Sequence, residues 1–210
     1  FAQVDDLGQI EEKDFTDAHL DAVLALPTVD VEAVRAAGFK VALDAVNSVG
    51  GIIMPRLLER MGVECVCVNC EPTGEFAHNP EPLPSNLVEL CEAVVANGAD
   101  FGVSVDPDVD RLALICENGQ PFGEEYTLVS VADYLLSRIY NEALETGKSI
   151  EEIAAPYQMV TSSNLSSSRA LRDVTEQYGG EYCTAAVGEV NVTTKMREAG
   201  ALIGGEGNGG

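Results

Sequence analysis

The chain has 210 residues, 46% of them hydrophobic, and this composition predicts a folded protein with one large core or two smaller ones. Its 35 acidic and 12 basic residues give a formal net charge of −23, which argues against binding to nucleic acid or to an anionic membrane surface. No apolar run reaches the ~20 residues of a membrane span, and six cysteines without paired zinc-type CxxC motifs are expected to be reduced core residues of a cytoplasmic protein.

The first part of the chain alternates between helix and strand patterns. Residues 18–26 (AHLDAVLAL) have helical spacing, and Pro27 should end that helix. Residues 39–46 (FKVALDAV) form an apolar run typical of a strand, and a helical pattern follows that ends at Gly62. Residues 63–68 (VECVCV) predict the next strand.

A proline-rich segment interrupts this alternation. Four prolines within residues 69–85 predict an irregular surface loop, because each proline removes a backbone donor and fixes φ. Ser85 is expected to cap a helix over residues 86–97, which Gly98 should end. Residues 101–105 (FGVSV) predict a third strand.

The second half of the chain continues the pattern. Residues 111–122 (RLALICENGQPF) predict a strand that turns at Asn118–Gly119, a pair common in hairpins, and residues 125–144 predict a longer helix. A weaker boundary follows at 145–153, after which strands and helices alternate to the end. The sequence therefore predicts an α/β fold of two successive domains, each a mixed, mostly parallel sheet with helices on its faces. Ligand sites in such folds lie beyond the carboxyl ends of the strands.

An acidic run stands at one of these strand ends. Asp106, Asp108 and Asp110 occupy alternate positions and repel one another unless a cation or hydrogen bonds compensate. Three carboxylates in a tight loop are suitable ligands for Mg²⁺, which prefers oxygen. Arg111 follows, and its guanidinium suits a phosphate or one of the carboxylates. The run therefore predicts a magnesium site.

Two other interpretations of this run stay open. Runs of charge usually face water, so the segment also fits a solvated turn with a structural arginine. The three aspartates and Glu117 fall at positions 1, 3, 5 and 12 of a calcium-binding EF-hand loop. Arg111 stands where that loop needs a glycine, and strand patterns flank the run where the EF-hand has helices, so the calcium interpretation is disfavoured.

The chain ends in a second candidate motif, GGEGNGG. Its glycines allow positive φ angles and close approach of a ligand, and the carboxylate of Glu206 with the amide of Asn208 could hydrogen-bond sugar hydroxyls. A glycine-rich turn after a strand is more often only a turn, and this one is not a GxGxxG followed by a helix.

Four segments in this order and at these separations carry a resemblance to a known family. They are KVALDAVNSVGG, NCEPTGEFAHNPEPLPSNL, GVSVDPDVDRLALICENG and AVGEVNVTTKMREAGALIGGEGNGG. Together they resemble the α-D-phosphohexomutase superfamily, the phosphoglucomutases and phosphomannomutases, over nearly the whole chain. The family has four domains. The resemblance implies that residues 1–27 are the end of domain I and a linker, residues 28–147 are domain II, and residues 148–210 are a C-terminally truncated domain III.

The resemblance implies a Mg²⁺-dependent isomerase that moves a phosphoryl group between O1 and O6 of a hexose phosphate through a phosphoserine. The substrate would be mannose, glucose or glucosamine phosphate. Carried over by position, the three aspartates would hold the metal and Arg111 would steady the transferring phosphate. Glu206, Gly207 and Asn208 would bind the sugar. Phosphoryl transfer depends mainly on positioning and charge neutralisation, which fits these residue types.

This chain departs from the common family motifs at several positions. The usual metal loop reads DGDGDR, whereas Pro107 and Val109 replace its glycines here. All three candidate ligands remain, so loop rigidity is expected to change and metal choice is not. The usual sugar loop reads GExSGH, whereas this chain has Asn208 in place of the serine and Gly210 in place of the histidine. Because that histidine is absent, the acid-base residue stays unassigned.

The catalytic serine of the family lies in a TASHNP-like motif that we do not find. The similar string at residues 76–80 (FAHNP) has no serine before His78 and lies in the proline-rich loop. The phosphate-binding loop of domain IV is also missing, so we expect a fragment that is inactive by itself.

Three alternative functions stay open. One is a phosphoglucosamine mutase of the same family, and another is a noncatalytic cation-binding α/β module. A Mg²⁺-dependent phosphatase with an aspartate nucleophile would need a lysine and a Ser/Thr motif that cannot be placed.

Overall fold

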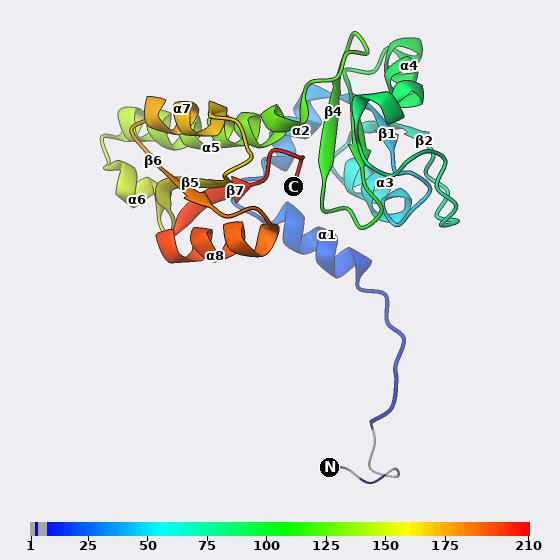
Figure 1. Cartoon of the computed structure of the whole chain (residues 1–210), viewed down its shortest axis with the longest axis horizontal. Coiled ribbons are helices and arrows are strands. Elements are labelled where there is room, and N and C mark those ends of the chain that lie inside the picture. Colours follow the sequence, from blue (N-terminus) through cyan, green and yellow to red (C-terminus); the bar gives the residue numbers. More distant parts are fainter. Residues whose placement is uncertain (1–2, 4–7) are drawn as a thin grey trace.

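The computed structural model describes residue 3 and residues 8–210, and its folded part is built around two β-sheets (Figure 1). The mixed α/β class with mostly parallel sheets is confirmed. In chain order the helices and strands are α1 (Thr16–Leu24), α2 (Val31–Ala37), β1 (Lys40–Asp44), α3 (Gly50–Arg60), β2 (Glu64–Val68), α4 (Val88–Asn97), β3 (Phe101–Val105), β4 (Leu112–Cys116), α5 (Glu124–Thr146), α6 (Ile150–Ala154), β5 (Gln158–Asn164), α7 (Ala170–Gln177), β6 (Glu181–Ala185), α8 (Glu189–Ala199) and β7 (Ala201–Gly205).

The first sheet has the strand order β2-β1-β3-β4. β1 pairs in parallel with β2 and with β3, whereas β4 runs antiparallel to β3. Side chains alternate along β1, so Val41 and Leu43 lie in the core with Leu58 of α3, while Ala42 lies in the core with Leu90 of α4. A strand covered on both faces needs an unbroken apolar run. In β1 this run is residues 41–43, between Lys40 and Asp44.

The second sheet has the order β6-β5-β7, and all three strands are parallel. Figure 1 shows α5 and α7 on one face of this sheet and α8 on the other. Ala132 and Leu136 of α5 pack with Leu171 of α7 in a buried cluster. Because β5 is central, its end is the most enclosed part of this sheet's carboxyl edge.

The carboxyl edges of the two sheets face a common region. The chain ends between the sheets in Figure 1, and the backbone N–H of Leu112 at the start of β4 donates to the carbonyl oxygen of Gly209 at 3.0 Å. Parallel strands place their following loops at one edge, so this contact joins the loop after β3 to the loop after β7.

The observed helices differ from the sequence prediction in four places. One is α6, which lies where the sequence predicted only a boundary at residues 145–153. α2 was not predicted, although Asp30 accepts a hydrogen bond from Ala33 N–H at its start and Gly38 ends it in the left-handed conformation. α1 ends at Leu24, before Pro27 is reached. Ser85 does not cap α4, because residues Pro84–Asn86 form a 3-10 turn and the helix begins only at Val88.

The other predicted elements between residues 39 and 205 are confirmed within a few residues of their expected bounds. The hairpin after β4 is present, with Ile115 bridged to Pro121 and Cys116 N–H donating to Gln120 O at 2.8 Å. The helix predicted at 125–144 is α5, which contacts β4 near its start and α7 along its length. The domain boundaries at residues 27 and 147 stay a prediction.

All six cysteines have free thiols. Five are half-buried, but Cys67 is exposed, so the expectation of core cysteines is wrong for that residue. Within residues 3 and 8–210, none of the helices is long and apolar enough to cross a membrane. The compartment stays a prediction.

Candidate functional site

The acidic loop follows β3 at the carboxyl edge of the first sheet. Asp106, Asp108 and Asp110 each offer a carboxylate oxygen, and these oxygens lie within 4.8 Å of one another. Asp106 is buried and the other two are exposed. In the described part of the chain these three residues form the one group of His, Cys, Asp or Glu side chains with such a spacing. The sequence grouped them correctly.

Hydrogen bonds from the backbone shape this loop. One oxygen of Asp106, Oδ1, accepts the N–H groups of Asp110 and Arg111 at 3.0 and 3.1 Å. Val109 has a φ of 62°, a left-handed value that allows the chain to turn back. The side chain of Val109 packs against the buried cluster that contains Val41 and Leu43. The hydroxyl of Ser48 donates to Pro107 O at 2.8 Å, which fastens the loop to the segment after β1. Together these contacts hold three like charges close together.

The loop has the donor set that a hard divalent cation needs. Oδ2 of Asp106 has no hydrogen-bond partner among the described residues, so it stays available while Oδ1 supports the turn. The cationic side chain paired with the loop in the described chain is Arg111, whose Nε lies 3.9 Å from Asp110 Oδ1. A single weak pair leaves most of the negative charge uncompensated. The residues therefore fit Mg²⁺ or a similar oxygen-preferring ion.

Arg111 reaches from the acidic loop to the proline-rich loop. Its Nη1 lies 2.5 Å from Glu81 Oε2, a shorter contact than the one it makes to Asp110. The side chain is 31% exposed. An anion that approached the acidic loop would compete with Glu81 for this guanidinium.

The glycine-rich loop follows β7 at the edge of the second sheet. Glu206 Oε1 accepts hydrogen bonds from Asn164 Nδ2 at 2.5 Å and from Gly188 N–H at 2.8 Å. Gly207 N–H donates to Ser167 Oγ at 2.9 Å. Glycine is required at Gly209, which has a φ of 91° and lies against the backbone of Leu112.

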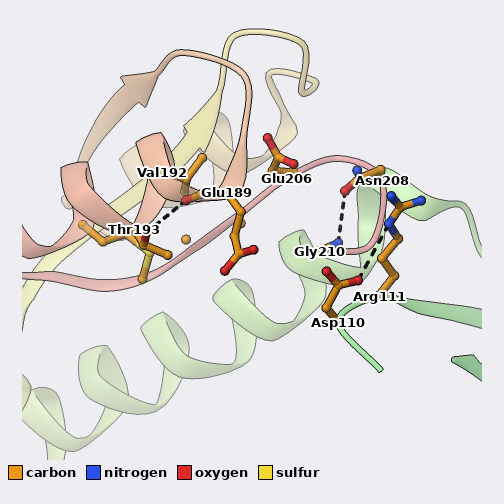
Figure 2. Close-up of a pocket in the computed structure, with 11 residues that line it drawn as sticks. Asp110, Arg111, Glu189, Val192, Thr193, Glu206, Asn208 and Gly210 are labelled. Carbon is orange, nitrogen blue, oxygen red and sulfur yellow. Dashed lines mark hydrogen bonds and ion pairs between the residues drawn. The ribbon is translucent and has the colours of Figure 1, made fainter. Parts of the chain in front are cut away.

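A cavity of about 270 Å³ lies between these two loops. Figure 2 shows Asp110 and Arg111 beside Asn208 and Gly210, with Glu189 and Glu206 further along the cavity. The residues that line it are Asp110, Arg111, Glu189, Val192, Thr193, Met196, Gly204, Gly205, Glu206, Asn208 and Gly210. Asp106, Asp108 and Gly207 are not in this lining set. The structure therefore brings four of the seven predicted site residues into one cavity.

The cavity carries more negative than positive charge. Asp110, Glu189 and Glu206 contribute carboxylates, and Arg111 contributes the one cationic side chain among the lining residues. Such a cavity repels a phosphate-bearing ligand unless a further cation is present. The acidic loop beside it is the place where such a cation fits.

Sequence reasoning missed Glu189 and the partners of the glycine-rich loop. Glu189 opens α8 after Gly188, and an acidic residue in the first turn of a helix usually only complements the helix dipole. Asn164 ends β5 and Ser167 follows it, in a serine-rich stretch that carried no distinctive motif. Their position at the carboxyl end of a predicted strand was the available signal.

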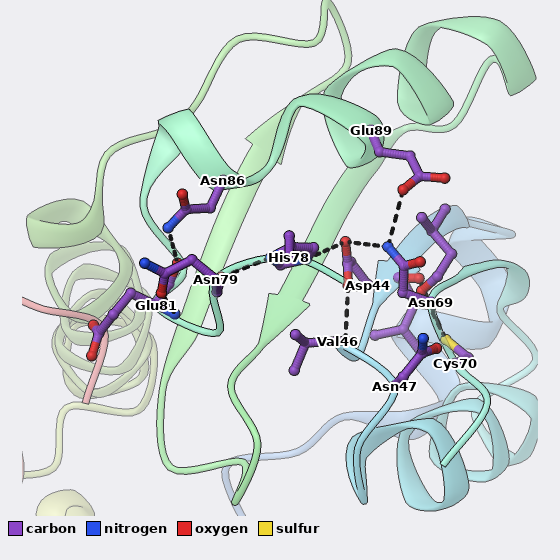
Figure 3. A network of polar contacts seen from close by, with 12 residues as sticks. Asp44, Val46, Asn47, Asn69, Cys70, His78, Asn79, Glu81, Asn86 and Glu89 are labelled. Atoms are coloured by element: carbon purple, nitrogen blue, oxygen red, sulfur yellow. Dashed lines mark hydrogen bonds and ion pairs between the residues drawn. The ribbon is translucent and has the colours of Figure 1, made fainter. Parts of the chain in front are cut away.

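His78 belongs to the string FAHNP, which sequence reasoning set aside as a match to the serine motif, and it lies in a separate polar network (Figure 3). Its Nε2 lies 3.1 Å from Oδ2 of the fully buried Asp44, and Asn69 Nδ2 donates to the same oxygen at 3.3 Å. Asp44 Oδ1 accepts Val46 N–H at 2.9 Å. These contacts fasten the proline-rich loop to the end of β1.

Two sequence models of one family match the chain. The first, described as phosphoglucomutase/phosphomannomutase, alpha/beta/alpha domain II, matches residues 17–119, and the second, domain III of the same family, matches residues 131–210. The two matches fall on the first and second sheet with their helices.

Curated relatives carry mutase names. The chain is 34% identical over all its 210 residues to a phosphoglucomutase/phosphomannomutase from Thermococcus kodakarensis, of which it spans 42%. It is 30% identical over 207 residues to a probable phosphoglucosamine mutase from Methanopyrus kandleri, of which it spans 41%. The chain thus spans about two fifths of the length of these relatives.

Solved structures have the same arrangement of elements. A phosphoglucomutase/phosphomannomutase family protein from Burkholderia thailandensis matches 95% of this chain with a TM-score of 0.72 and 27% identity, and 39% of that protein is covered. A putative phosphomannomutase from Thermus thermophilus matches 97% of the chain with a TM-score of 0.80. Its identity is 22% and 43% of it is covered, so it supports the fold alone.

Proposed function

Because the chain belongs to the phosphoglucomutase/phosphomannomutase family, we propose that it is the second- and third-domain portion of a hexose phosphate mutase. In this proposal residues 1–27 end domain I and link it to the rest, residues 28–147 are domain II, and residues 148–210 belong to domain III. The reaction is an intramolecular phosphoryl transfer between O1 and O6 of a hexose phosphate. The phosphoserine that donates and regains the phosphoryl group belongs to a part of the longer polypeptide outside this chain.

Each loop has a distinct role in this proposal. Asp106, Asp108 and Asp110 would hold Mg²⁺, which when bound neutralises phosphoryl charge and polarises a phosphoryl oxygen. Arg111 binds a phosphate oxygen pair with its guanidinium, in exchange for Glu81. In the glycine-rich loop, Glu206 accepts hydrogen bonds from sugar hydroxyls, and Asn208 accepts or donates them. Gly207 lets this sugar-binding loop pack closely against Glu125, whose carboxylate an added Cβ would meet.

The observation that carries the proposal is that residues of both loops line one cavity. A noncatalytic cation-binding module needs only the acidic loop. Its function does not explain why the glycine-rich loop lies beside the acidic loop. The hydrogen bond from Leu112 N–H to Gly209 O keeps the two loops together. An anionic donor and an anionic substrate repel each other, so a metal loop beside the sugar loop is what phosphoryl transfer requires.

The sugar is the finer part of the proposal. We favour glucose or mannose phosphate because the relative from Thermococcus kodakarensis carries both mutase names. Glucosamine phosphate is the second candidate, because the relative from Methanopyrus kandleri is named a probable phosphoglucosamine mutase.

The test uses the complete polypeptide in which this chain occurs. Purified protein is incubated with each of the three hexose 1-phosphates and a trace of the matching 1,6-bisphosphate, and ³¹P NMR follows formation of the 6-phosphate with and without Mg²⁺. We expect conversion of at least one sugar, dependent on Mg²⁺. The function is wrong if none of the three is converted.

Asp108→Asn tests the metal assignment within this experiment. The change keeps the size of the side chain but removes one anionic ligand, so the affinity for Mg²⁺ measured by calorimetry should fall by about tenfold or more. Glu117→Gln is the matched control, because Glu117 lies outside the acidic cluster and is exposed. Equal Mg²⁺ affinities for Asp108→Asn and wild type contradict the metal assignment. A lower affinity in Glu117→Gln supports the calcium-loop interpretation instead.

A further inference from the structure

We propose that Asn164 is a positioning residue that fixes the carboxylate of Glu206, with one oxygen anchored and the other left for the ligand. As far as the ligand is a hexose phosphate, this inference rests on the proposed function. Asn164 is the last residue of β5 and is 3% exposed. It is not among the residues that line the cavity, so it acts through Glu206.

The two oxygens of Glu206 have different surroundings. Oε1 accepts Asn164 Nδ2 at 2.5 Å and Gly188 N–H at 2.8 Å, whereas Oε2 has no hydrogen-bond partner among the described residues. Two donors on one oxygen define the orientation of the carboxylate plane. Oε2 is therefore the acceptor that Glu206 can offer to a ligand, and the group that binds it must be a donor, such as a hydroxyl or an ammonium.

The orientation of the Asn164 amide is determined by its neighbours. Its Oδ1 lies within hydrogen-bond distance of four donors, the N–H and the hydroxyl of Ser166 and of Ser167, at 2.8 to 3.1 Å. An amide nitrogen in that place would face two backbone N–H donors, so the oxygen occupies it and the nitrogen faces the carboxylate of Glu206. The oxygen thus orders the turn after β5, and the nitrogen orders the glycine-rich loop.

A second contact extends the same arrangement by one residue. Ser167 Oγ, which donates to Asn164 Oδ1 at 2.8 Å, accepts the N–H of Gly207 at 2.9 Å. Asn164 therefore supports two successive residues of the glycine-rich loop, one directly and one through Ser167.

Sheet register explains why these distant residues meet. β5 and β7 are parallel neighbours, and Ser163 pairs with Gly205. The residues that follow this pair, Asn164 at the end of β5 and Glu206 directly after β7, therefore lie at the same edge of the sheet. β5 is the central strand and pairs with a neighbour on each side, so the position of Asn164 is fixed by both β6 and β7.

The negative charge of Glu206 is stabilised in part by the side-chain amide of Asn164. No lysine or arginine of the described chain forms a salt bridge with Glu206, so neutral donors alone stabilise this half-buried carboxylate. Hydrogen bonds to a charged acceptor are the strong ones. An aspartate in place of Asn164 would replace the donor by a second negative charge.

The test compares Asn164→Asp, Glu206→Gln and the double variant with wild type in the complete polypeptide. Asn164→Asp should lower the hydrogen-exchange protection of the Gly188 and Gly207 amides by about tenfold or more, because a charge-assisted hydrogen bond is replaced by repulsion. In the double variant the donor and the acceptor exchange places, because the new glutamine can put its Nε2 where Glu206 Oε1 stood and donate to the new aspartate. Gly188 N–H, which shared that oxygen, then faces a donor and stays unprotected. The Gly207 amide, which is held through Ser167, should return close to the wild-type protection, which a merely structural effect of either change does not give.

The kinetic readout separates positioning from general destabilisation. Asn164→Asp should raise KM for the hexose phosphate by about tenfold with a much smaller change in kcat, because Glu206 binds ground state and transition state alike. Asn118→Asp is the matched control, since Asn118 is exposed and its side chain uses only the oxygen, which aspartate keeps. It should leave both readouts unchanged.

Each outcome decides the inference separately from the function. An active enzyme whose Asn164→Asp variant keeps the wild-type KM overturns the inference and leaves the proposed function standing. A double variant whose Gly207 amide is as unprotected as in Asn164→Asp also overturns it. A wild-type protein that converts no hexose phosphate contradicts the proposed function, while the exchange measurements still decide whether Asn164 positions Glu206.

Discussion

The carboxylate of Asp106 has two oxygens with separate tasks. Oδ1 accepts two backbone N–H groups and so shapes the acidic loop, while Oδ2 stays free of partners in the described chain. Glu206 repeats this division, with Oε1 anchored and Oε2 free among the described residues. In both loops a fixed oxygen orients the free one, which lowers the entropy lost when a ligand is bound.

Three cysteines with distinct surroundings, Cys65, Cys67 and Cys70, lie on β2 and directly after it. Cys65 Sγ lies 3.8 Å from Cys67 Sγ, as expected for alternate residues on one face of a strand. Burial, with a smaller effect of the neighbouring Cys67 thiol, raises the pKa of Cys65 and of Cys70 from 9.0 to about 12. Both thiols therefore stay protonated far above neutral pH.

Limited alkylation should distinguish these cysteines. The thiolate is the reactive form, and a pKa of about 12 in place of 9.0 makes it about a thousandfold rarer at pH 8. Iodoacetamide followed by peptide mass spectrometry should find Cys67 modified first, because it is exposed. The denatured chain is the control and should lose this order. Equal rates at Cys65 and Cys67 in the folded chain contradict the prediction.

The same pKa shifts have a consequence for stability. Above pH 9 the thiols of the unfolded chain ionise while those of Cys65 and Cys70 stay neutral in the fold, so the folded state then binds more protons than the unfolded state. The free energy of unfolding should therefore fall as the pH rises from 9 towards 12.

At the scale of elements, α5 is the helix that connects the two sheets. Near its start Thr127 Oγ1 donates to Leu112 O at 3.4 Å, and further along Leu136 is fully buried with Leu171 of α7. Its opposite face is exposed, with Tyr134 at 45%, and so is its C-terminal end, with Leu144 at 68%. The helix is thus amphipathic, which is why its period was recognisable in the sequence.

Truncation of two leucines in α5 tests this packing. Leu136→Ala removes a fully buried side chain and should lower the free energy of unfolding by about 2–5 kcal/mol. Leu144→Ala is the same change in the same helix at an exposed position and should cost about 0.5 kcal/mol or less. Urea unfolding measures both. Similar losses in the two variants would mean that the buried face of α5 does not support the fold.

At the scale of the whole molecule, the contact between Gly209 and Leu112 joins the loops of the two sheets. Leu112 directly follows Arg111, so the hydrogen bond from Leu112 N–H to Gly209 O connects the glycine-rich loop to the acidic loop. A Cβ at Gly209 would lie 2.6 Å from Leu112 O, and its φ of 91° disfavours any other residue. The backbone contact between the two loops therefore depends on one glycine.

Gly209→Ala should separate the two loops. The added methyl group displaces the backbone of residue 209, and the exchange protection of the Leu112 amide should fall by about tenfold because its acceptor is lost. Gly179→Ala is the matched control, since Gly179 also has a positive φ, 75°, but no atom within 4 Å of an added Cβ. An unchanged Leu112 amide in Gly209→Ala contradicts the role of this contact.

Much of the fold followed from the sequence because its signals are local. Apolar runs such as VALD in β1, glycines such as Gly98 and the period of α5 each fix a nearby segment, and these elements are present as predicted. α2 was missed because its seven residues bury no side chain, so no apolar face marked it. Ser85 was misassigned because Pro84 favours a 3-10 turn before the helix begins.

The sequence by itself determined the α/β alternation, the family and the three clustered aspartates, since each depends on local motifs and on their order along the chain. Only the tertiary structure decided that Glu206 is held by Asn164, 42 residues away, and that Gly209 binds Leu112. Such pairs are set by strand register and by the way the two sheets meet. That information arises when distant segments pack together, so no local pattern of residues carries it.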